Sequence, residues 1–201
     1  MPKETFFNLE DDKKQKIIQA CIDEFAQHPF SSASINQIIK HANISRGSFY
    51  QYFDDKEDCY MFLLSEVAKV KMDLLKNATV EHQGNSFFDN LMVMLEQTLT
   101  WIEKEPKLYA IGVLMEYDNS DFIQRLMDKN KAGIELFKAL VKQDIDKGYI
   151  RQDIDVDLMV QMLMSVNRDV LMTAYRERDF EKVKYQFRQV LNIIKEGAQH
   201  V

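Results

Sequence analysis

Apolar residues recur at helical spacing along nearly the whole chain, and this periodicity limits the fold more than any other feature. One stripe runs from Ile17 to Phe25, and a cleaner one occupies positions 35, 38, 39 and 42. No segment shows the strict alternation of a half-buried strand. Only 6 glycines and 3 prolines interrupt the 201 residues, so helix breakers are scarce. The sequence therefore predicts an all-α fold with about nine helices.

The expected helices fall into two groups, separated by the polar stretch TVEHQGNS at 79–86. The first group predicts a three-helix domain over residues 1–54. The second group, over residues 55–201, begins with a long connecting helix at about 55–78 and continues as a helical bundle. Its further helices are expected over 86–104, 106–115, 119–147, 155–177 and 179–197.

Several classes of protein are disfavoured by what the sequence lacks. No apolar run approaches the roughly 20 residues of a membrane span, and the N-terminal MPKETFFNLEDDKKQK has no apolar signal-peptide core. We therefore expect a cytoplasmic protein without a membrane partner. Phosphate loops, nucleophile elbows and paired metal-ligand motifs are missing, and the four histidines are scattered. We expect no enzyme activity, no metal and no cofactor.

The two cysteines, Cys21 and Cys59, lie far apart in sequence and within apolar helical patterns. Buried thiols that stay reduced are one interpretation, and a redox switch is the other. The sequence leaves both open.

The stretch HANISRGSFYQYFDDKE at 41–57 surrounds four aromatic residues with small polar ones. Asn43 tolerates a left-handed turn, and Ser45 can cap a short helix after it. Two short helices joined by a tight turn predict a helix-turn-helix, a DNA-reading motif. No Asp or Glu occurs from Phe25 to Phe53, as expected for a surface that lies against phosphates, although the net charge of the chain is -6. A neutral packing surface is the alternative.

The segment SINQIIKHANISRGSFYQYFDDKEDCYMFLL resembles the DNA-binding segment of the TetR/AcrR transcriptional regulators, over about residues 10 to 65. The resemblance implies an N-terminal DNA-binding domain and a C-terminal domain that binds an effector and forms a homodimer. Three departures, Ile39, Asn43 and Cys59, fall outside the expected DNA contacts. Phe49 and Phe53 are expected in the core. The expected contacts to double-stranded DNA are Asn36, Ser45, Arg46, Gly47, Ser48, Tyr50, Gln51, Tyr52 and Lys56.

Within this set, the side-chain chemistry favours different roles. Arg46 is the best candidate to read a base, because a guanidinium can pair bidentately with guanine. Tyr50 is expected to reach phosphate through its hydroxyl, and Lys56 through its charge from the start of the long helix. The resemblance implies a palindromic operator and, by default, repression; activation stays open.

The C-terminal half contains most of the 11 methionines, between Met92 and Met172. Methionine adapts to irregular cavities, so a mainly apolar pocket for a small lipophilic effector is one interpretation. An ordinary methionine-rich core is the other. The residues expected at the pocket are Met92, Trp101, Tyr109, Met115, Tyr117, Phe137, Met159, Met162 and Asn167.

The last two expected helices are long and amphipathic, and the resemblance places the homodimer interface there. The polar triplet Asn167, Arg168 and Asp169 interrupts the first of them and could face the pocket, the dimer seam or water. A helical protein-interaction module is a rival explanation for this bundle, but it does not explain the acid-free segment. The expected interface residues are Val170, Ala174, Phe187, Val190, Leu191 and Ile194.

Overall fold

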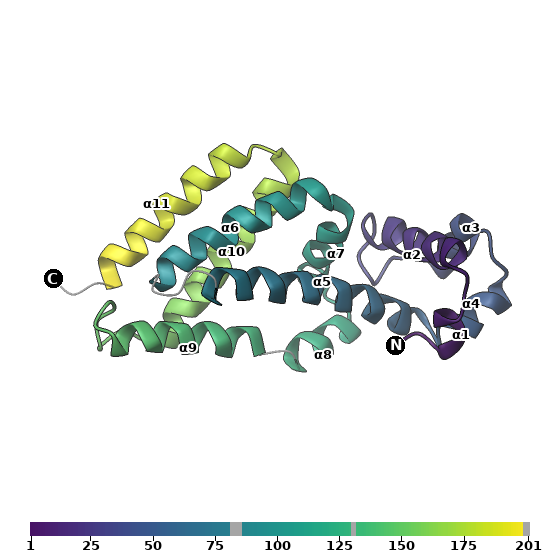
Figure 1. The fold of residues 1–201 in the computed structure, drawn as a ribbon, viewed down its shortest axis with the longest axis horizontal. Helices are drawn as coiled ribbons and strands as arrows, with labels where there is room; N and C mark the ends of the chain where they lie inside the picture. Colours follow the sequence, from purple (N-terminus) through teal and green to yellow (C-terminus); the bar gives the residue numbers. More distant parts are fainter. Residues whose placement is uncertain (81–85, 130–131, 199–201) are drawn as a thin grey trace. The chain divides into compact units, whose positions relative to one another are not determined.

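The computed structural model describes residues 1–80, 86–129 and 132–198, and these residues form helices and no strands (Figure 1). The all-α prediction is confirmed. The predicted break at 79–86 falls mostly on residues outside this part of the chain. The helices are α1 (Glu4–Phe7), α2 (Asp11–Phe25), α3 (Ile35–Ala42), α4 (Arg46–Tyr52), α5 (Lys56–Val80), α6 (Phe87–Lys104), α7 (Pro106–Glu116), α8 (Asp121–Lys129), α9 (Ala132–Asp146), α10 (Val156–Glu177) and α11 (Phe180–Ala198).

One helix within this described part was not anticipated, the single turn α1, which precedes the first expected helix. The expected helix at 119–147 corresponds to α8 and α9, and residues 130–131 between them lie outside the described residues. The other boundaries agree with the sequence to within a few residues because strong local signals set them. Asn43 has a left-handed φ of 51° at the end of α3, and Pro106 occupies the first turn of α7. The Asp155 carboxylate caps α10 by accepting from the Leu158 amide at 3.0 Å.

The chain divides into two compact units, 1–72 with 105–127 and 73–104 with 128–201. The expected domain boundary after residue 54 does not coincide with the division between these two compact units. Leu63 of α5, Ile111 of α7 and Ile123 of α8 are buried in the same hydrophobic core as the N-terminal helices. Residues 55–72 and 105–127 therefore pack with the first unit although they follow the expected boundary in sequence.

The first unit is held together by an aromatic core. Phe25 and Phe30 lie with their ring centroids 4.9 and 5.1 Å from that of Tyr60 on α5. Phe30 also packs on Phe122 of α8 at 4.4 Å. Such tilted pairs add to the free energy of burying large rings. The short helices of this unit are therefore fixed mainly by tertiary packing.

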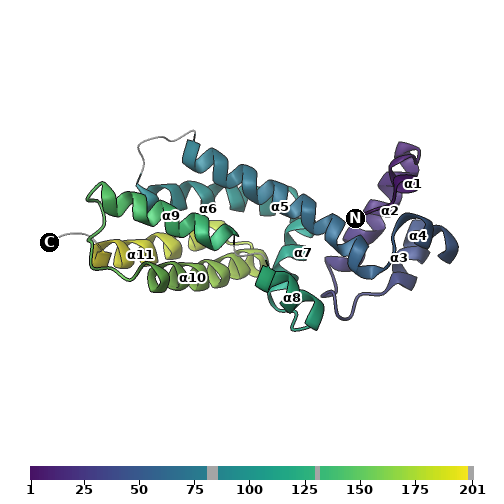
Figure 2. The same cartoon turned by 90° about the horizontal axis from the view of Figure 1, so that it is seen from below.

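The second unit is a four-helix arrangement in which α10 contacts α9 and α11, and α6 contacts both of these as well (Figure 2). This pairing closes a ring of four helices around an interior. The buried carboxylate of Asp144 on α9 accepts a hydrogen bond from the Phe87 amide at 2.6 Å and so fixes the start of α6. The Arg151 amide donates to the Ala198 carbonyl at 2.9 Å, which fastens the end of α11.

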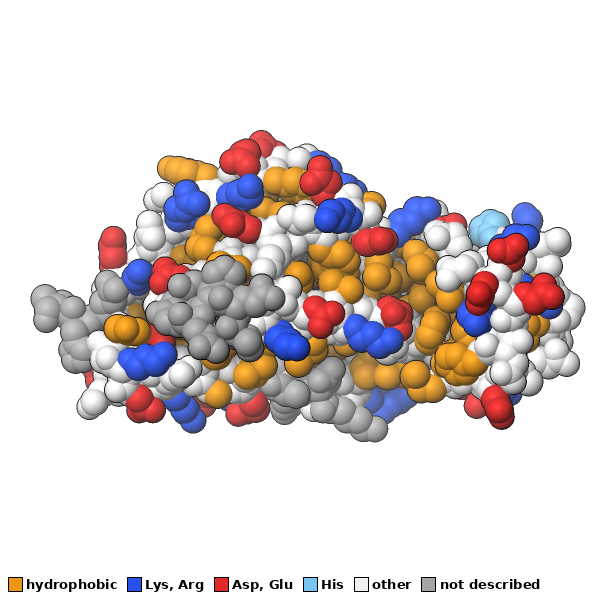
Figure 3. Space-filling view, in the orientation of Figure 1, with side chains coloured by type: hydrophobic (Ala, Val, Ile, Leu, Met, Phe, Trp, Pro, Cys, Tyr) orange, Lys and Arg blue, Asp and Glu red, His pale blue; other side chains and the backbone are white. Residues whose placement is uncertain are grey.

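The visible surface carries interspersed acidic and basic side chains, with apolar side chains exposed between them (Figure 3). No helix in the described ranges is long and apolar enough to cross a membrane.

Candidate nucleic-acid interface and ligand cavity

The helix-turn-helix consists of α3 and α4 with residues 43–45 between them. The Ser45 hydroxyl caps α4 by accepting from the Ser48 amide at 3.0 Å, as the sequence predicted. Phe49 and Phe53 are fully buried, which confirms their expected place in the core. The opposite side of α4, with Arg46, Gly47, Tyr50 and Gln51, is exposed. One side of α4 therefore anchors the helix and the other faces solvent.

Three of the expected contact residues form one exposed cluster. The Arg46 guanidinium donates to the Asn36 side-chain oxygen at 2.8 Å and lies 3.4 Å from the Tyr50 hydroxyl. Its carbon lies 5.6 Å from the centre of the Tyr50 ring. These contacts join a residue of α3 to two of α4 and restrict the guanidinium before any partner binds. Such restriction reduces the side-chain entropy that binding would otherwise cost.

Gly47 in the first turn of α4 is not required by packing within the protein. A Cβ added there would meet only the Ser45 hydroxyl, at an ordinary distance of 3.7 Å. Glycine in a helix is less favourable than alanine, so its presence has a cost that the described contacts do not explain. A partner surface that approaches the backbone closely at this point would explain it.

Tyr52 is among the expected DNA contacts, but its side chain does not point outward. Only 5% of Tyr52 is exposed, and its ring lies 6.2 Å from that of Phe6 on α1. The reason is helical spacing, because Tyr52 follows Phe49 by three residues and so lies on the buried side of α4.

Lys56 at the start of α5 has a different environment from the one expected. Its ammonium donates to the carbonyls of Phe30 at 2.7 Å and Ala33 at 3.1 Å, and lies 4.5 Å from the Phe30 ring centre. Burial lowers the pKa of Lys56, and the nearby carboxylates of Asp118 and Glu24 oppose that shift. The ammonium holds the turn before α3, so a contact to phosphate would require it to leave these carbonyls.

Two buried carboxylates also stabilise the turn before α3, and the sequence did not predict them. Glu24 accepts from the Ser34 amide at 2.7 Å, and Asp118 accepts from the Ser31 and Ser120 amides at 2.7 and 2.8 Å. Burial raises the pKa of Asp118, but these hydrogen bonds outweigh it and leave the pKa below the usual value. Glu24 could have been found, because it lies seven residues after Ile17 on the apolar stripe of α2.

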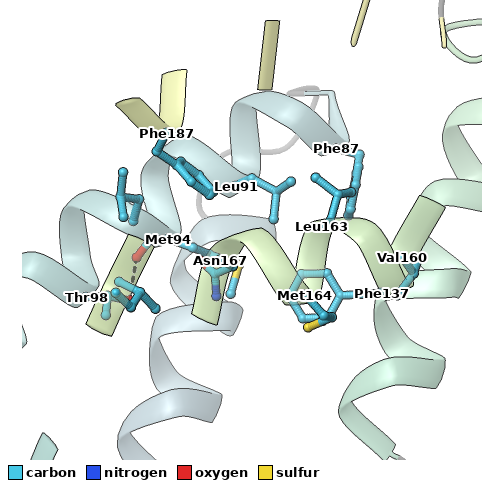
Figure 4. A pocket seen from close by; sticks show the side chains of 12 residues that line it. Phe87, Leu91, Met94, Thr98, Phe137, Val160, Leu163, Met164, Asn167 and Phe187 are labelled. Atoms are coloured by element: carbon cyan, nitrogen blue, oxygen red, sulfur yellow. Dashed lines mark hydrogen bonds between the residues drawn. The ribbon is translucent and has the colours of Figure 1, made fainter. Parts of the chain in front are cut away.

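The second unit contains a cavity of about 50 Å³ between α6, α9, α10 and α11 (Figure 4). Thr98 and Asn167 are its polar lining residues. The Thr98 hydroxyl donates to the Met94 carbonyl at 2.7 Å, so the Asn167 amide is the stronger candidate to bond a ligand. The lining consists of Phe87, Leu91, Met94, Leu95, Thr98, Phe137, Val160, Leu163, Met164, Asn167, Leu171 and Phe187.

Of the residues expected at a pocket, the structure places Phe137 and Asn167 at this cavity. Met92, Met159 and Met162 belong to the correct helices but lie on other faces, since the lining stripes follow positions 91, 94, 95 and 98 and positions 160, 163, 164, 167 and 171. Trp101 and Tyr109 are buried elsewhere, and Met115 and the exposed Tyr117 belong to the first unit.

Three of the six expected interface residues are not available at the surface. Ala174, Phe187 and Leu191 are buried within the single chain, and Phe187 lines the cavity. Val170, Val190 and Ile194 are partly exposed. The sequence correctly identified α10 and α11 as amphipathic helices, but the most apolar positions of these helices face the interior of the second unit. Of the polar triplet, Asn167 faces the cavity, whereas Arg168 and Asp169 are exposed.

The two cysteines lie together inside the first unit. The Cys59 Sγ is 3.2 Å from the Cys21 Sγ, both residues are buried, and they form no disulfide. Burial raises the pKa of the Cys59 thiol. A protonated thiol is a poor nucleophile, so this environment slows oxidation of the pair. Among the described residues, no group of three or more His, Cys, Asp or Glu side chains could hold a metal ion.

A helix-turn-helix whose second helix has an exposed, acid-free side defines the class of helical DNA-binding proteins. Residues 17–61 match the family model "Bacterial regulatory proteins, tetR family". A TetR family transcriptional regulator from Chloroflexus aurantiacus is 30% identical, with all of both chains covered and a TM-score of 0.78. The chain belongs to the TetR family of DNA-binding transcriptional regulators, which are not enzymes.

Two further relatives are more distant. The fatty acid metabolism regulator protein of Bacillus subtilis is 21% identical over 167 residues, which cover 80% of this chain and 82% of that protein. The structure of Bacillus subtilis FadR in complex with stearoyl-CoA is 17% identical, covers 92% of this chain and 99% of that one, and has a TM-score of 0.72. This structural likeness shows a shared fold.

Proposed function

We propose that the protein represses transcription as a homodimer bound to a palindromic operator, and that a small lipophilic effector in the α6–α9–α10–α11 cavity releases it. The observation that carries this proposal is the cavity, which is apolar except for Thr98 and Asn167. Release requires only that the effector bind more tightly to the form with low affinity for DNA.

The exposed side of α4 supports the DNA-binding half of the proposal. Arg46, backed by Asn36, reads a base, and the hydroxyls of Ser45, Ser48 and Tyr50 with the Gln51 amide donate to phosphates. Gly47 admits close approach of the duplex.

This half is tested by a gel shift with DNA from the gene's own promoter region. The affinity should fall steeply as salt rises, because phosphate binding releases counterions. The double variant Arg46→Ala, Tyr50→Phe should lose sequence-specific binding. Full retention of specific binding by this variant would overturn the assignment of α4 residues, and no binding by the wild type would favour a protein-interaction module.

The lining favours an effector with a long apolar chain and one polar group near Asn167. Each methylene removed from water contributes about 0.8 kcal/mol, so every part of an apolar chain that enters between these helices adds to the affinity. An acyl chain with its carbonyl at the Asn167 amide has this chemistry. The stearoyl-CoA complex of a relative with the same fold supports this choice.

Thermal unfolding with stearoyl-CoA and with coenzyme A alone tests the effector class. Only the acylated compound should raise the melting temperature of the wild type. Phe137→Trp places extra bulk in the cavity and should abolish the shift, whereas the matched variant Leu136→Trp, at an exposed neighbour, should keep it. A response to polar compounds alone would contradict an apolar site.

The homodimer is supported by exposed apolar side chains on α10 and α11. Met162 is 50% and Ile193 is 71% exposed, and the partly exposed Val190 precedes Ile193 by one helical turn. Exposed apolar groups of this kind are typical of interaction surfaces. In sedimentation experiments, Ile193→Glu should dissociate the dimer, and Tyr149→Glu, at an exposed position outside these helices, should not. A wild type that sediments as a monomer would refute the dimer.

A further inference from the structure

The backbone carbonyls in the last turn of α4 accept hydrogen bonds from residues outside the helix-turn-helix. This helix has only 7 residues and no basic residue in its last turn. The final carbonyls of any helix have no partner within it, and a helix this short is unstable by itself. Three successive carbonyls, those of Tyr50, Gln51 and Tyr52, nevertheless accept hydrogen bonds from residues near the start of the chain.

Lys3 and Thr5 supply these bonds. The Lys3 ammonium donates to the Tyr50 carbonyl at 2.8 Å, and the Lys3 amide donates to the Tyr52 carbonyl at 2.8 Å. The Thr5 hydroxyl donates to the Gln51 carbonyl. A positive charge at this end also matches the direction of the helix dipole.

The donors are themselves fixed in place. Phe6, in the single turn α1, is only 1% exposed, and its ring centre lies 5.1 Å from that of Phe53 and 5.6 Å from that of Phe62. The Lys3 ammonium also pairs with the Asp54 carboxylate at 2.7 Å. The ammonium is thus committed to a carbonyl and a carboxylate of the protein.

We propose that residues 3–6 form an N-terminal clip that holds α4 in the orientation needed to read the operator, and that Lys3 and Thr5 are positioning residues for specific DNA binding. The clip acts through the backbone of Tyr50 and Gln51, whose side chains are expected to contact phosphate. A small displacement of this backbone moves the whole exposed side of α4. This inference rests on the use of α4 to read DNA.

Hydrogen exchange of the full-length protein without DNA tests the clip independently of any operator. Thr5→Val and Lys3→Met should accelerate exchange of the Phe53 amide and of the other amides in the last turn of α4, and leave those in the middle of α2 unchanged. Thr5→Ser keeps the hydroxyl and should restore protection. Unchanged exchange at α4 in both variants would overturn the clip, whether or not the protein binds DNA.

Binding to a duplex that the wild type selects from random-sequence DNA tests the positioning role. The Lys3→Met, Thr5→Val double variant should bind this duplex about tenfold more weakly, equivalent to ~1.4 kcal/mol. Its affinity for an unrelated duplex should not change. Thr5→Ser and Lys147→Met, which removes an exposed charge from the second unit, should match the wild type.

The other outcomes of this binding experiment separate the proposals. An equal loss on both duplexes, with a shallower salt dependence, would make Lys3 a phosphate contact and overturn positioning. Wild-type affinity in the double variant would overturn it as well. Failure of the wild type to select any sequence would refute operator reading itself. The hydrogen-exchange experiment would then still show whether the N-terminal clip stabilises α4.

Discussion

The exposed side of α4 and the cavity of the second unit are built in opposite ways. On α4, Arg46 and Tyr50 protrude from a helix whose cap, Ser45, and buried anchor, Phe49, are neighbours in sequence. The cavity is a space left between four helices that are spread over residues 87–198. A protruding surface needs only a stable base, whereas a void keeps its shape only while every helix around it keeps its rotation. Substitutions on α4 should therefore have separable effects on stability and binding, and substitutions at the cavity should couple the two.

The largest expected effect is on the base of α4. Phe49→Ala removes a fully buried ring and should lower the free energy of unfolding by about 3–5 kcal/mol. Tyr50→Ala, on the exposed side of the same helix, should change it by no more than about 0.5 kcal/mol. Urea denaturation followed by circular dichroism measures both. Similar losses in the two variants would mean that α4 does not have separate structural and exposed sides.

A smaller effect is expected on the exposed side. Arg46→Ala should weaken binding to the selected operator by about 1–3 kcal/mol, because a bidentate base contact is lost. The free energy of unfolding and the stearoyl-CoA response should stay as in the wild type. Fluorescence anisotropy with a labelled duplex measures the affinity. Arg151→Ala removes an exposed arginine from the second unit and is the control. An equal loss of DNA affinity in this control would mean that Arg46 acts only through the net charge of the protein.

A substitution of Asp118 tests whether the segment 105–127 stabilises the first unit, which also contains α4. Hydrogen bonds hold the folded pKa of Asp118 below the ordinary value of about 3.9, so the ionised form stabilises the folded state. This contribution is complete above that ordinary pKa and is lost as the pH falls through the lower, folded pKa. Asp118→Asn should therefore cost about 1 kcal/mol at neutral pH and progressively less in acid. Urea titrations across this pH range give the measurement, and a cost independent of pH would contradict the role of the charge.

The smallest effect is expected at Gly47. Gly47→Ala should raise the free energy of unfolding by no more than about 1 kcal/mol and still weaken operator binding, because the new methyl group would obstruct close approach of the duplex. Gly133→Ala, at an exposed position of α9 with no atom near its added Cβ, should bring a similar gain in stability without any change in DNA affinity. Unchanged DNA affinity in Gly47→Ala would show that the duplex does not approach this backbone.

The two regions also differ in how far the sequence predicted them. The turn at Asn43, the cap at Ser45 and the buried Phe49 follow from local rules that act over a few residues, and the structure confirms all three. The burial of Tyr52 also follows from a local rule, its spacing of three residues from Phe49, but the sequence did not show that Phe6, far away in the chain, packs against its ring.

The cavity was predicted only as a type of site. Composition pointed to the half of the chain that contains the cavity, and Phe137 and Asn167 line this cavity. The remaining lining depends on how α6 and α10 are rotated against their neighbours, and a shift of two positions along a helix exchanges Met164 for Met162. The sequence of one helix does not determine that rotation when apolar residues occur on several of its faces.

We propose that α4 reads DNA and that occupancy of the cavity controls this reading. The most direct test follows the anisotropy of a labelled operator duplex, bound to the full-length protein, while stearoyl-CoA is added. We predict release of the duplex from the wild type and from Leu136→Trp, retention by Phe137→Trp, and no effect of coenzyme A alone. A duplex that stays bound to the wild type at a stearoyl-CoA concentration that saturates its thermal shift, or that leaves Phe137→Trp just as readily, would contradict control of DNA binding by the cavity.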